Sequence, residues 1–318
     1  MDQIQHKQLN ISELNLHIAD IGTGPAVIFL HGFPEIWYSW RHQMVALAAA
    51  GFHAIAPDWR GYGLSDQPPH PENATYMDLI ADLLAILDLL HIPKAFVVGK
   101  DFGAMPAYLF ALMHPERVSG VITLGIPYML PSLRKHTNQH LPKGFYIRRW
   151  QEPGRAEADF GRFDVRTVIR NIYILFSGSE LPIAGDDQEI MDLVHPSTVL
   201  PNWFSEEDLN VYASLYENSG FRFPLEVPYR CIKRSFKEAD HSAATDLKVR
   251  VPALLVMGRR DYFLKFPGIE DYINSPLLKE NVPDLKIVFM PEGTHFVQEQ
   301  FPEEINQLII DFLKKHTE

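Results

Sequence analysis

Asp101 is the residue whose setting says most about the chemistry of this chain. It lies in the segment GKDFG at 99–103, directly after the apolar run at 95–98. The small residues at both ends of this segment permit a strained turn between a strand and a helix, and such a turn would expose the carboxylate at the edge of a sheet. A carboxylate in that position predicts nucleophilic attack on carbon, which forms an alkyl ester.

A second acid and a histidine follow two further apolar runs. Asp261 comes after the run at 253–257, and His295 comes after the run at 286–290. The order nucleophile, acid, histidine, each on a loop after a strand, is typical of the α/β-hydrolase fold. Loops at the carboxyl edge of a parallel sheet converge, so we expect Asp101, Asp261 and His295 to form one catalytic triad.

A further turn directly follows the apolar run at 26–30 and consists of His31, Gly32, Phe33 and Pro34. In this fold the turn at that position carries one of two backbone N–H groups that bind a negatively charged oxygen in the transition state. We expect the N–H groups of Phe33 and Phe102 to form this oxyanion hole. The oxygen that they stabilise would belong to the ester of Asp101 while water attacks it.

Apolar runs and helical patterns alternate along most of the chain, which indicates a mostly parallel α/β sheet with helices packed on it. The predicted strands are 14–20, 26–30, 52–56, 95–98, 121–124, 253–257 and 286–290. The predicted helices are 40–50, 76–90, 104–113, 206–217 and 303–315. The strand at 14–20 is expected to belong to an opening hairpin.

This alternation stops between about residues 127 and 248, where the sequence is rich in proline, aromatic residues and paired charges. We therefore predict an α/β-hydrolase core domain made of residues 1–128 and 249–318. A helical cap domain at 129–248 is predicted to be inserted between the two parts of the core. The central sheet of the core should carry helices on both faces.

Composition and charge exclude several classes of protein. The chain has 318 residues, a formal charge of −11 and one cysteine, Cys231. The negative charge argues against a nucleic-acid surface, and a single cysteine cannot form an internal disulfide. No apolar run approaches the ~20 residues of a membrane span, and the first residues do not resemble a secretion signal. A cytoplasmic protein, either a monomer or a homodimer, fits these features.

Taken together, these segments resemble the soluble epoxide hydrolases of the α/β-hydrolase superfamily, most closely the plant enzymes. The resemblance covers nearly the whole chain. Besides the turn around Asp101, it rests on HGFPE at 31–35, WYSWR at 37–41, DWRGYGLSD at 58–66 and GTHF at 293–296. It implies that an epoxide is hydrolysed to a vicinal diol. Asp101 would open the epoxide, and His295 would activate the water that hydrolyses the ester.

The resemblance also implies two cap tyrosines that hydrogen-bond the epoxide oxygen. The segment FYIRRWQ at 145–151 is similar to the first lid motif of these enzymes and points to Tyr146. The segment PYR at 228–230 is similar to the second and points to Tyr229. Tyr212 and Tyr216 stay open as alternatives to Tyr229.

The expected partners are a small epoxide molecule and water. The sequence has neither a His-Glu-x-x-His motif nor a cluster of cysteines, so it predicts no metal site. The glycines at 22 and 24 lack the rest of a dinucleotide fingerprint and are interpreted as a turn. No cofactor is therefore expected.

Two positions depart from the family pattern, and one of them bears on an alternative function. Lys100 stands where a histidine usually precedes the nucleophile, and Phe102 replaces the commoner tryptophan. A haloalkane or haloacid dehalogenase shares the same triad chemistry, but it usually binds the halide with an indole N–H that Phe102 cannot supply. A small-molecule receptor that keeps the fold without turnover is a further alternative, and the complete triad argues against it.

Overall fold

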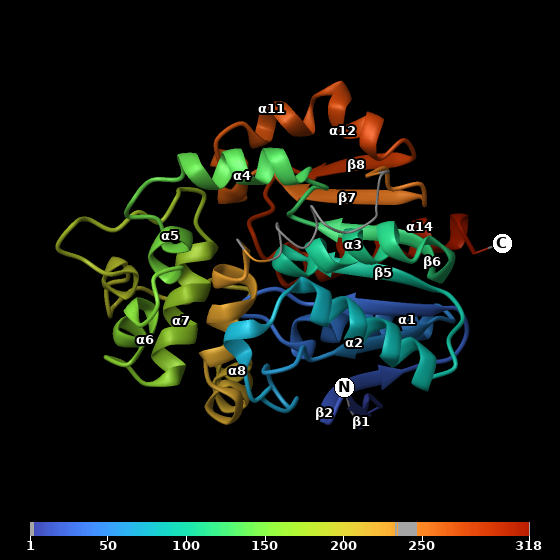
Figure 1. The fold of residues 1–318 in the computed structure, drawn as a ribbon, viewed down its shortest axis with the longest axis horizontal. Helices are drawn as coiled ribbons and strands as arrows, with labels where there is room; N and C mark the ends of the chain where they lie inside the picture. The colour runs from blue at the N-terminus through green and yellow to red at the C-terminus, as the bar shows by residue number, and fades with distance from the viewer. Residues whose placement is uncertain (1–2, 233, 235–246, 318) are drawn as a thin grey trace.

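The computed structural model describes residues 3–232, 234 and 247–317, and its centre is a twisted eight-stranded sheet (Figure 1). The strand order is β1-β2-β4-β3-β5-β6-β7-β8. The strands are β1 (Gln5–Ile11), β2 (Leu14–Ile21), β3 (Ala26–Leu30), β4 (His53–Pro57), β5 (Ala95–Lys100), β6 (Val118–Leu124), β7 (Ala253–Gly258) and β8 (Leu285–Met290). Strands β3 to β8 run parallel, whereas β2 pairs antiparallel with both β1 and β4.

All of the predicted strands occur, and the prediction of an α/β-hydrolase fold with a mostly parallel sheet is confirmed. Strand β1 completes the expected opening hairpin with β2. Its sequence, QHKQLNI, is largely polar, and most of its side chains are exposed at the edge of the sheet. An exposed edge strand of this kind needs few apolar residues, which explains why its range was not predicted.

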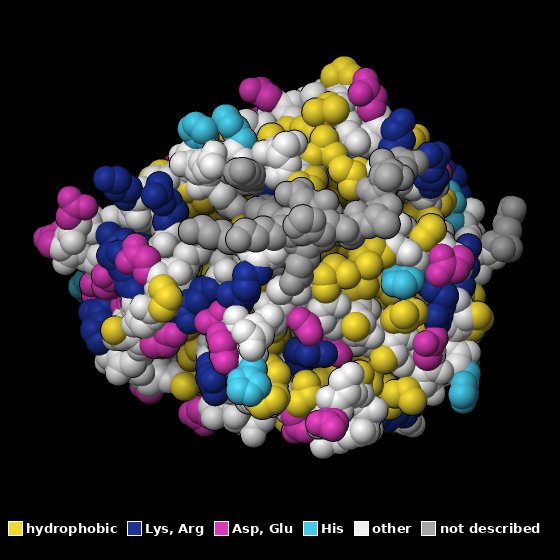
Figure 2. Space-filling model, viewed as in Figure 1, with side chains coloured by type: hydrophobic (Ala, Val, Ile, Leu, Met, Phe, Trp, Pro, Cys, Tyr) yellow, Lys and Arg dark blue, Asp and Glu magenta, His cyan; other side chains and the backbone are white. Residues whose placement is uncertain are grey.

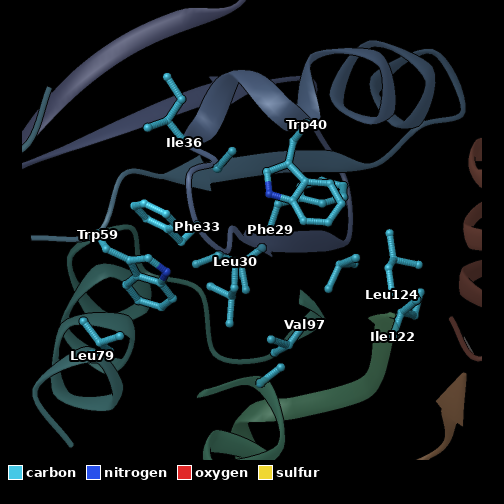
Figure 3. Close-up of a cluster of buried hydrophobic side chains, with 14 of the residues drawn as sticks. Phe29, Leu30, Phe33, Ile36, Trp40, Trp59, Leu79, Val97, Ile122 and Leu124 are labelled. Atoms are coloured by element: carbon cyan, nitrogen blue, oxygen red, sulfur yellow. The ribbon is translucent and has the colours of Figure 1, made fainter. Parts of the chain in front are cut away.

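The central strands are apolar because both of their faces are covered. Every residue of β3 and of β5 is buried. Figure 3 shows Phe29 of β3 beside Trp40, with Val97 of β5 and Ile122 of β6 in the same cluster. The ring centroids of Phe29 and Trp40 lie 5.0 Å apart. Full burial of one such side chain stabilises a fold by about 1.5–3 kcal/mol, so this cluster holds the strand ends in fixed positions.

Helices cover both faces of the sheet. They are α1 (Arg41–Ala49), α2 (Tyr76–Leu89), α3 (Ala104–Met113), α11 (Ile269–Ile273), α12 (Pro276–Asn281), α13 (Val297–Gln300) and α14 (Pro302–Lys315). Phe312 of α14 packs on Gly120 of β6, and the hydroxyl of Tyr108 in α3 lies 2.9 Å from that of Thr123 in the same strand. Residues three apart in a strand face opposite sides, so α3 and α14 lie on opposite faces.

Between β6 and β7 the described residues form helices and contribute no strand to the sheet. These helices are α4 (Pro131–His140), α5 (Tyr146–Trp150), α6 (Arg155–Phe160), α7 (Val165–Phe176), α8 (Glu206–Ser219), α9 (Arg222–Pro224) and the π-helical turn η6 (Leu225–Arg230). In Figure 1, α5 to α8 gather beyond one end of the sheet, on the left. The division into a core and a cap domain stays a prediction, and residues 233 and 235–246 of the predicted cap lie outside the described residues.

Charged side chains of both signs are interspersed over the face shown in Figure 2, with apolar side chains between them. The net negative charge of the chain is therefore not concentrated in one negatively charged area on this face.

Among the described residues, no helix is both long enough and apolar enough to span a lipid bilayer.

Candidate active site

Asp101 sits on a strained turn between β5 and α3. It begins the 3₁₀ turn η3 (Asp101–Gly103), has a φ of 51° and is only 5% exposed. A positive φ is unusual for a residue with a Cβ and is tolerated only where the surroundings enforce it. The surroundings here are tight, because the backbone of the turn packs against the end of β3. A Cβ on Gly103 would lie 2.1 Å from the carbonyl oxygen of Leu30. The turn thus passes so close to β3 that it directs the carboxylate of Asp101 away from the sheet.

Replacement of Gly103 by alanine is therefore expected to destabilise the fold by about 3 kcal/mol, since a backbone atom rather than a flexible side chain would have to move. Urea unfolding would measure the loss of free energy. Gly185 is the matched control, because it is exposed and a Cβ there would lie no closer than 3.2 Å to the tip of Asp187. Equal unfolding free energies for Gly103→Ala and Gly185→Ala would contradict this account of the turn.

The structure brings Asp101, Asp261 and His295 together. Nε2 of His295 lies 3.2 Å from Oδ2 of Asp101, and Nδ1 lies 3.0 Å from Oδ1 of Asp261. Asp261 precedes the turn η7 (Tyr262–Lys265) and also accepts the backbone N–H of Phe263 at 2.9 Å. Asp261 is thus placed to orient the imidazole through Nδ1, while Nε2 faces Asp101, the proposed nucleophile.

The second oxygen of Asp101 points into the predicted oxyanion hole. The backbone N–H of Phe33 donates to Oδ1 of Asp101 at 3.1 Å, and the N–H of Phe102 also donates to this carboxylate. Gly32 permits the close approach, because a Cβ there would lie 2.4 Å from Oδ1. The two donors therefore act on the nucleophile's own carboxyl group, which is where negative charge would develop if water attacked an ester of Asp101.

His31 and Pro34 belong to the same turn and do not touch Asp101 through a hydrogen bond. Nε2 of His31 accepts the backbone N–H of Trp59 at 3.1 Å, and Nδ1 lies 2.9 Å from the carbonyl oxygen of Gly32. Burial lowers the pKa of His31 to about 4, so the imidazole is neutral at pH 7. Its part in the site is to fix the turn that carries Phe33.

The protonation states of the triad follow from its charges. Burial alone would raise the pKa of Asp101, but the hydrogen bond and charge of His295 and the charge of Lys100 outweigh it and lower that pKa. Burial lowers the pKa of His295, but the charge of Asp261 and the hydrogen bonds to both carboxylates raise it to about 9. Asp101 is thus ionised, and loss of its negative charge would lower the pKa of His295 and favour the neutral imidazole.

The two predicted cap tyrosines lie beside each other above Asp101. Tyr146 begins α5, Tyr229 lies in η6, and their ring centroids are 6.0 Å apart. The hydroxyl of Tyr146 lies 3.1 Å from that of Tyr262, whereas the buried hydroxyl of Tyr229 has no hydrogen-bond partner among the described residues. Burial, reinforced by the charge of Asp101, raises the pKa of both Tyr146 and Tyr229, which therefore keep their protons.

The two alternative tyrosines both lie in α8. The hydroxyl of Tyr212 donates to Oε1 of Glu299 at 3.2 Å. The ring of Tyr216 stacks on that of Phe221 at 4.9 Å, and the charge of Asp101 is not among the causes of its raised pKa. The contacts of Tyr229 with Phe102, at 5.3 Å between ring centroids, favour Tyr229 as the second donor.

A cavity of about 80 Å³ lies beside the triad. Asp101, His295, Tyr146 and Tyr262 line it, together with apolar side chains such as Met105 and Ile126. This lining suits a small, mostly apolar molecule whose one polar group meets the reacting residues. Among the described residues, no group of three or more histidine, cysteine, aspartate or glutamate side chains could hold a metal ion.

Tyr262 is the site residue that the sequence did not reveal. It directly follows Asp261, is 1% exposed, and its ring centroid lies 5.0 Å from that of His295. No motif marks it, and only its adjacency to the predicted acid could have singled it out. It positions Tyr146 through the contact between the two hydroxyls.

Comparison with known proteins agrees with this geometry. A model of the alpha/beta hydrolase fold family matches residues 25–302. Epoxide hydrolase 2 of Siraitia grosvenorii is 37% identical over 324 residues, which cover 99% of this chain and 100% of that protein. Bifunctional epoxide hydrolase 2 of Rattus norvegicus is 33% identical over 95% of this chain and 54% of that longer protein.

Solved structures give the same result. The epoxide hydrolase VrEH1 of Vigna radiata has a TM-score of 0.92 and 36% identity, with 99% of each chain covered. Epoxide hydrolase I of potato (Solanum tuberosum) has a TM-score of 0.89 and 32% identity, with 98% of this chain and 99% of that one covered. The chain therefore belongs to the α/β-hydrolase fold family and, within it, to the epoxide hydrolases.

Proposed function

We propose that this enzyme hydrolyses epoxides to vicinal diols through a covalent ester on Asp101. The proposal rests on the contacts of the two oxygens of the Asp101 carboxylate. One oxygen lies 3.1 Å from the backbone nitrogen of Phe33, and the other lies 3.2 Å from Nε2 of His295. A carboxylate that only bound substrate would need neither an oxyanion hole nor a base directed at it.

In the first step, an oxygen of Asp101 attacks one carbon of the epoxide. The bond between that carbon and the ring oxygen breaks, and the ring oxygen leaves as an alkoxide on the other carbon. Tyr146 and Tyr229 donate hydrogen bonds to this oxygen, and one of them transfers its proton. A phenol, with an ordinary pKa of about 10, is a stronger acid than the alcohol that forms when the alkoxide takes up a proton, so the transfer is favourable.

In the second step, His295 removes a proton from water, which attacks the carbonyl carbon of the Asp101 ester. The N–H groups of Phe33 and Phe102 stabilise the tetrahedral oxyanion, and Asp261 stabilises the imidazolium. Collapse of this intermediate releases the diol, whose alcohol oxygen takes the proton from His295. Collapse leaves Asp101 as a carboxylic acid, and its proton passes by way of the solvent to the tyrosinate, which regenerates the starting state.

A single turnover in water labelled with ¹⁸O tests this mechanism. With enzyme in excess, the diol should carry no label, because its new oxygen comes from Asp101, and one labelled oxygen should appear in the peptide that contains Asp101. Mass spectrometry of both products would measure this. Label in the diol of the first turnover would show direct attack by water and would overturn the covalent proposal.

A dehalogenase is the second candidate that the triad permits. The side chain of Phe102 packs edge-on against Tyr229 and offers no N–H beside the nucleophile, which favours the epoxide. Haloalkanes assayed beside epoxides should therefore release no halide while the epoxides yield diol. A receptor without turnover is excluded if diol forms at all. A cytoplasmic location and a monomeric or homodimeric state remain predictions.

A further inference from the structure

Lys100 is a buried cation that the proposed mechanism does not use. It ends β5, directly before Asp101, and its side chain is 0% exposed. Its ammonium group has no hydrogen-bond partner among the described residues. An ammonium removed from water without a hydrogen-bonded partner is costly to the fold, so its presence here calls for a compensating role.

The ammonium of Lys100 lies on the Asp261 side of the imidazole. A methyl group placed on Gly125 would lie 3.1 Å from Oδ2 of Asp261, 3.7 Å from Nζ of Lys100 and 4.0 Å from Nδ1 of His295. Nζ also lies 5.5 Å from the ring centroid of Phe296. The positive charge is thus next to the acid–histidine pair and away from the cavity, whose lining does not include Lys100.

The other charged and titratable groups around His295 come from every loop that packs there. They are Asp101 after β5, Asp261 and Tyr262 after β7, Glu35 in the loop after β3 and Glu299 in α13. Glu299 is paired with Arg41 at 2.7 Å. Burial raises the pKa of Glu35 to about 7, and the charge of Lys100 opposes that rise. Among the described residues named here, Lys100 is therefore a nearby cation that has no carboxylate at hydrogen-bond distance.

We propose that Lys100 is a positioning residue of the hydrolytic step, whose buried positive charge keeps His295 unprotonated while Asp101 is an ester. This inference rests on the covalent mechanism proposed above. When Asp101 becomes an ester, its negative charge disappears, and Asp261 remains as the strongest charge that favours an imidazolium. A protonated His295 could not accept a proton from water. The repulsion by Lys100 opposes that protonation at the stage where a free base is required.

Removal of the charge should therefore move the acid limb of ester hydrolysis to higher pH. In Lys100→Met, decay of the ester should lose half of its maximal rate at a pH about one unit higher than in the unsubstituted enzyme. The measurement is the pH dependence of ester decay after rapid mixing with a reactive epoxide, followed by intact-mass spectrometry. Lys94→Met is the matched control, because it removes an exposed lysine just before the other end of β5.

Two further variants separate charge from packing. Lys100→Arg retains the charge and should keep the acid limb where it is, even if the maximal rate falls. Lys100→Gln also removes the charge but keeps a polar side chain, so it should move the limb to higher pH and tests the same charge if Lys100→Met does not fold. A purely structural role for Lys100 would change the rate at every pH alike and leave the limb in place.

The outcomes distinguish this inference from the mechanism on which it rests. An ester that forms and decays in Lys100→Met with an unshifted limb overturns the role of Lys100 and leaves the covalent mechanism intact. An unshifted limb in Lys100→Gln overturns it equally if Lys100→Met does not fold. Absence of any ester in the unsubstituted enzyme and in His295→Gln overturns the mechanism itself.

Discussion

Replacement of His295 by glutamine is expected to stop the enzyme with substrate bonded to Asp101. A carboxylate attacks without a base to remove a proton, and the charge of Lys100 still favours the ionised form of Asp101, so the first step should proceed. Hydrolysis of the ester, in contrast, requires the proton acceptor that lies 3.2 Å from Oδ2. Steady-state turnover should fall by about 10³-fold or more. Intact-mass spectrometry should show the protein heavier by the mass of one epoxide, and peptide mapping should locate the addition at Asp101.

His195→Gln is the matched control, because His195 is exposed and bonds to Ser197, far from the triad in the sequence. It should turn over normally and show no adduct. An adduct on any residue other than Asp101, or full turnover in His295→Gln, would assign the base to another group. Asp101→Ala combined with His295→Gln should form no adduct, which confirms the site of attachment.

Joint replacement of Tyr146 and Tyr229 by phenylalanine is expected to disable the first step. Each hydroxyl would donate to the oxygen that gains charge as the epoxide opens, and loss of one such donor typically costs about 10²-fold or more. The double variant should thus form the ester about 10⁴-fold more slowly, while an ester formed slowly should still be hydrolysed at the normal rate. Rapid-quench measurement of ester formation and decay separates the two steps.

Tyr216→Phe is the control for this pair, because the hydroxyl of Tyr216 is equally buried and lacks a hydrogen-bond partner among the described residues. Its ring stacks on Phe221, and the proposed mechanism gives its hydroxyl no part, so its loss should leave ester formation unchanged. A strong effect of Tyr216→Phe combined with a weak effect of Tyr229→Phe would assign the second hydrogen-bond donor to Tyr216 in place of Tyr229. Equal losses in both steps would indicate a folding defect and would contradict donation to the epoxide.

The sheet and the positions of the triad residues were predictable because both depend on local patterns. Asp101, Asp261 and His295 each follow a short apolar run, and parallel strands necessarily place such loops at one edge. Strand β1 was harder to delimit, since an exposed edge strand carries little apolar signal. Strand ends shifted by up to three residues, as at β6, because the last backbone pairs depend on neighbours and not on the strand's own residues.

The parts of the site that depend on packing between distant segments were not predictable. Tyr262 touches Tyr146 across 116 positions of sequence, and no spacing rule connects two residues so far apart. The choice among Tyr212, Tyr216 and Tyr229 likewise required the position of η6 relative to Phe102. Lys100 stood out in the sequence as a departure from a pattern, but its full burial beside Asp261 became visible only in the folded chain.

The long insertion between β6 and β7 has a consequence for how this architecture can diversify. The two strands are hydrogen-bonded neighbours, with Leu124 opposite Val256, although more than a hundred residues separate them in the chain. The entropic cost of closing so long a connection rises by only about 0.6 kcal/mol for each doubling of its length. Evolution can therefore lengthen, shorten or remodel the connection at little thermodynamic penalty, and so reshape the chamber around a new substrate while the hydrolytic machinery below it is inherited unchanged.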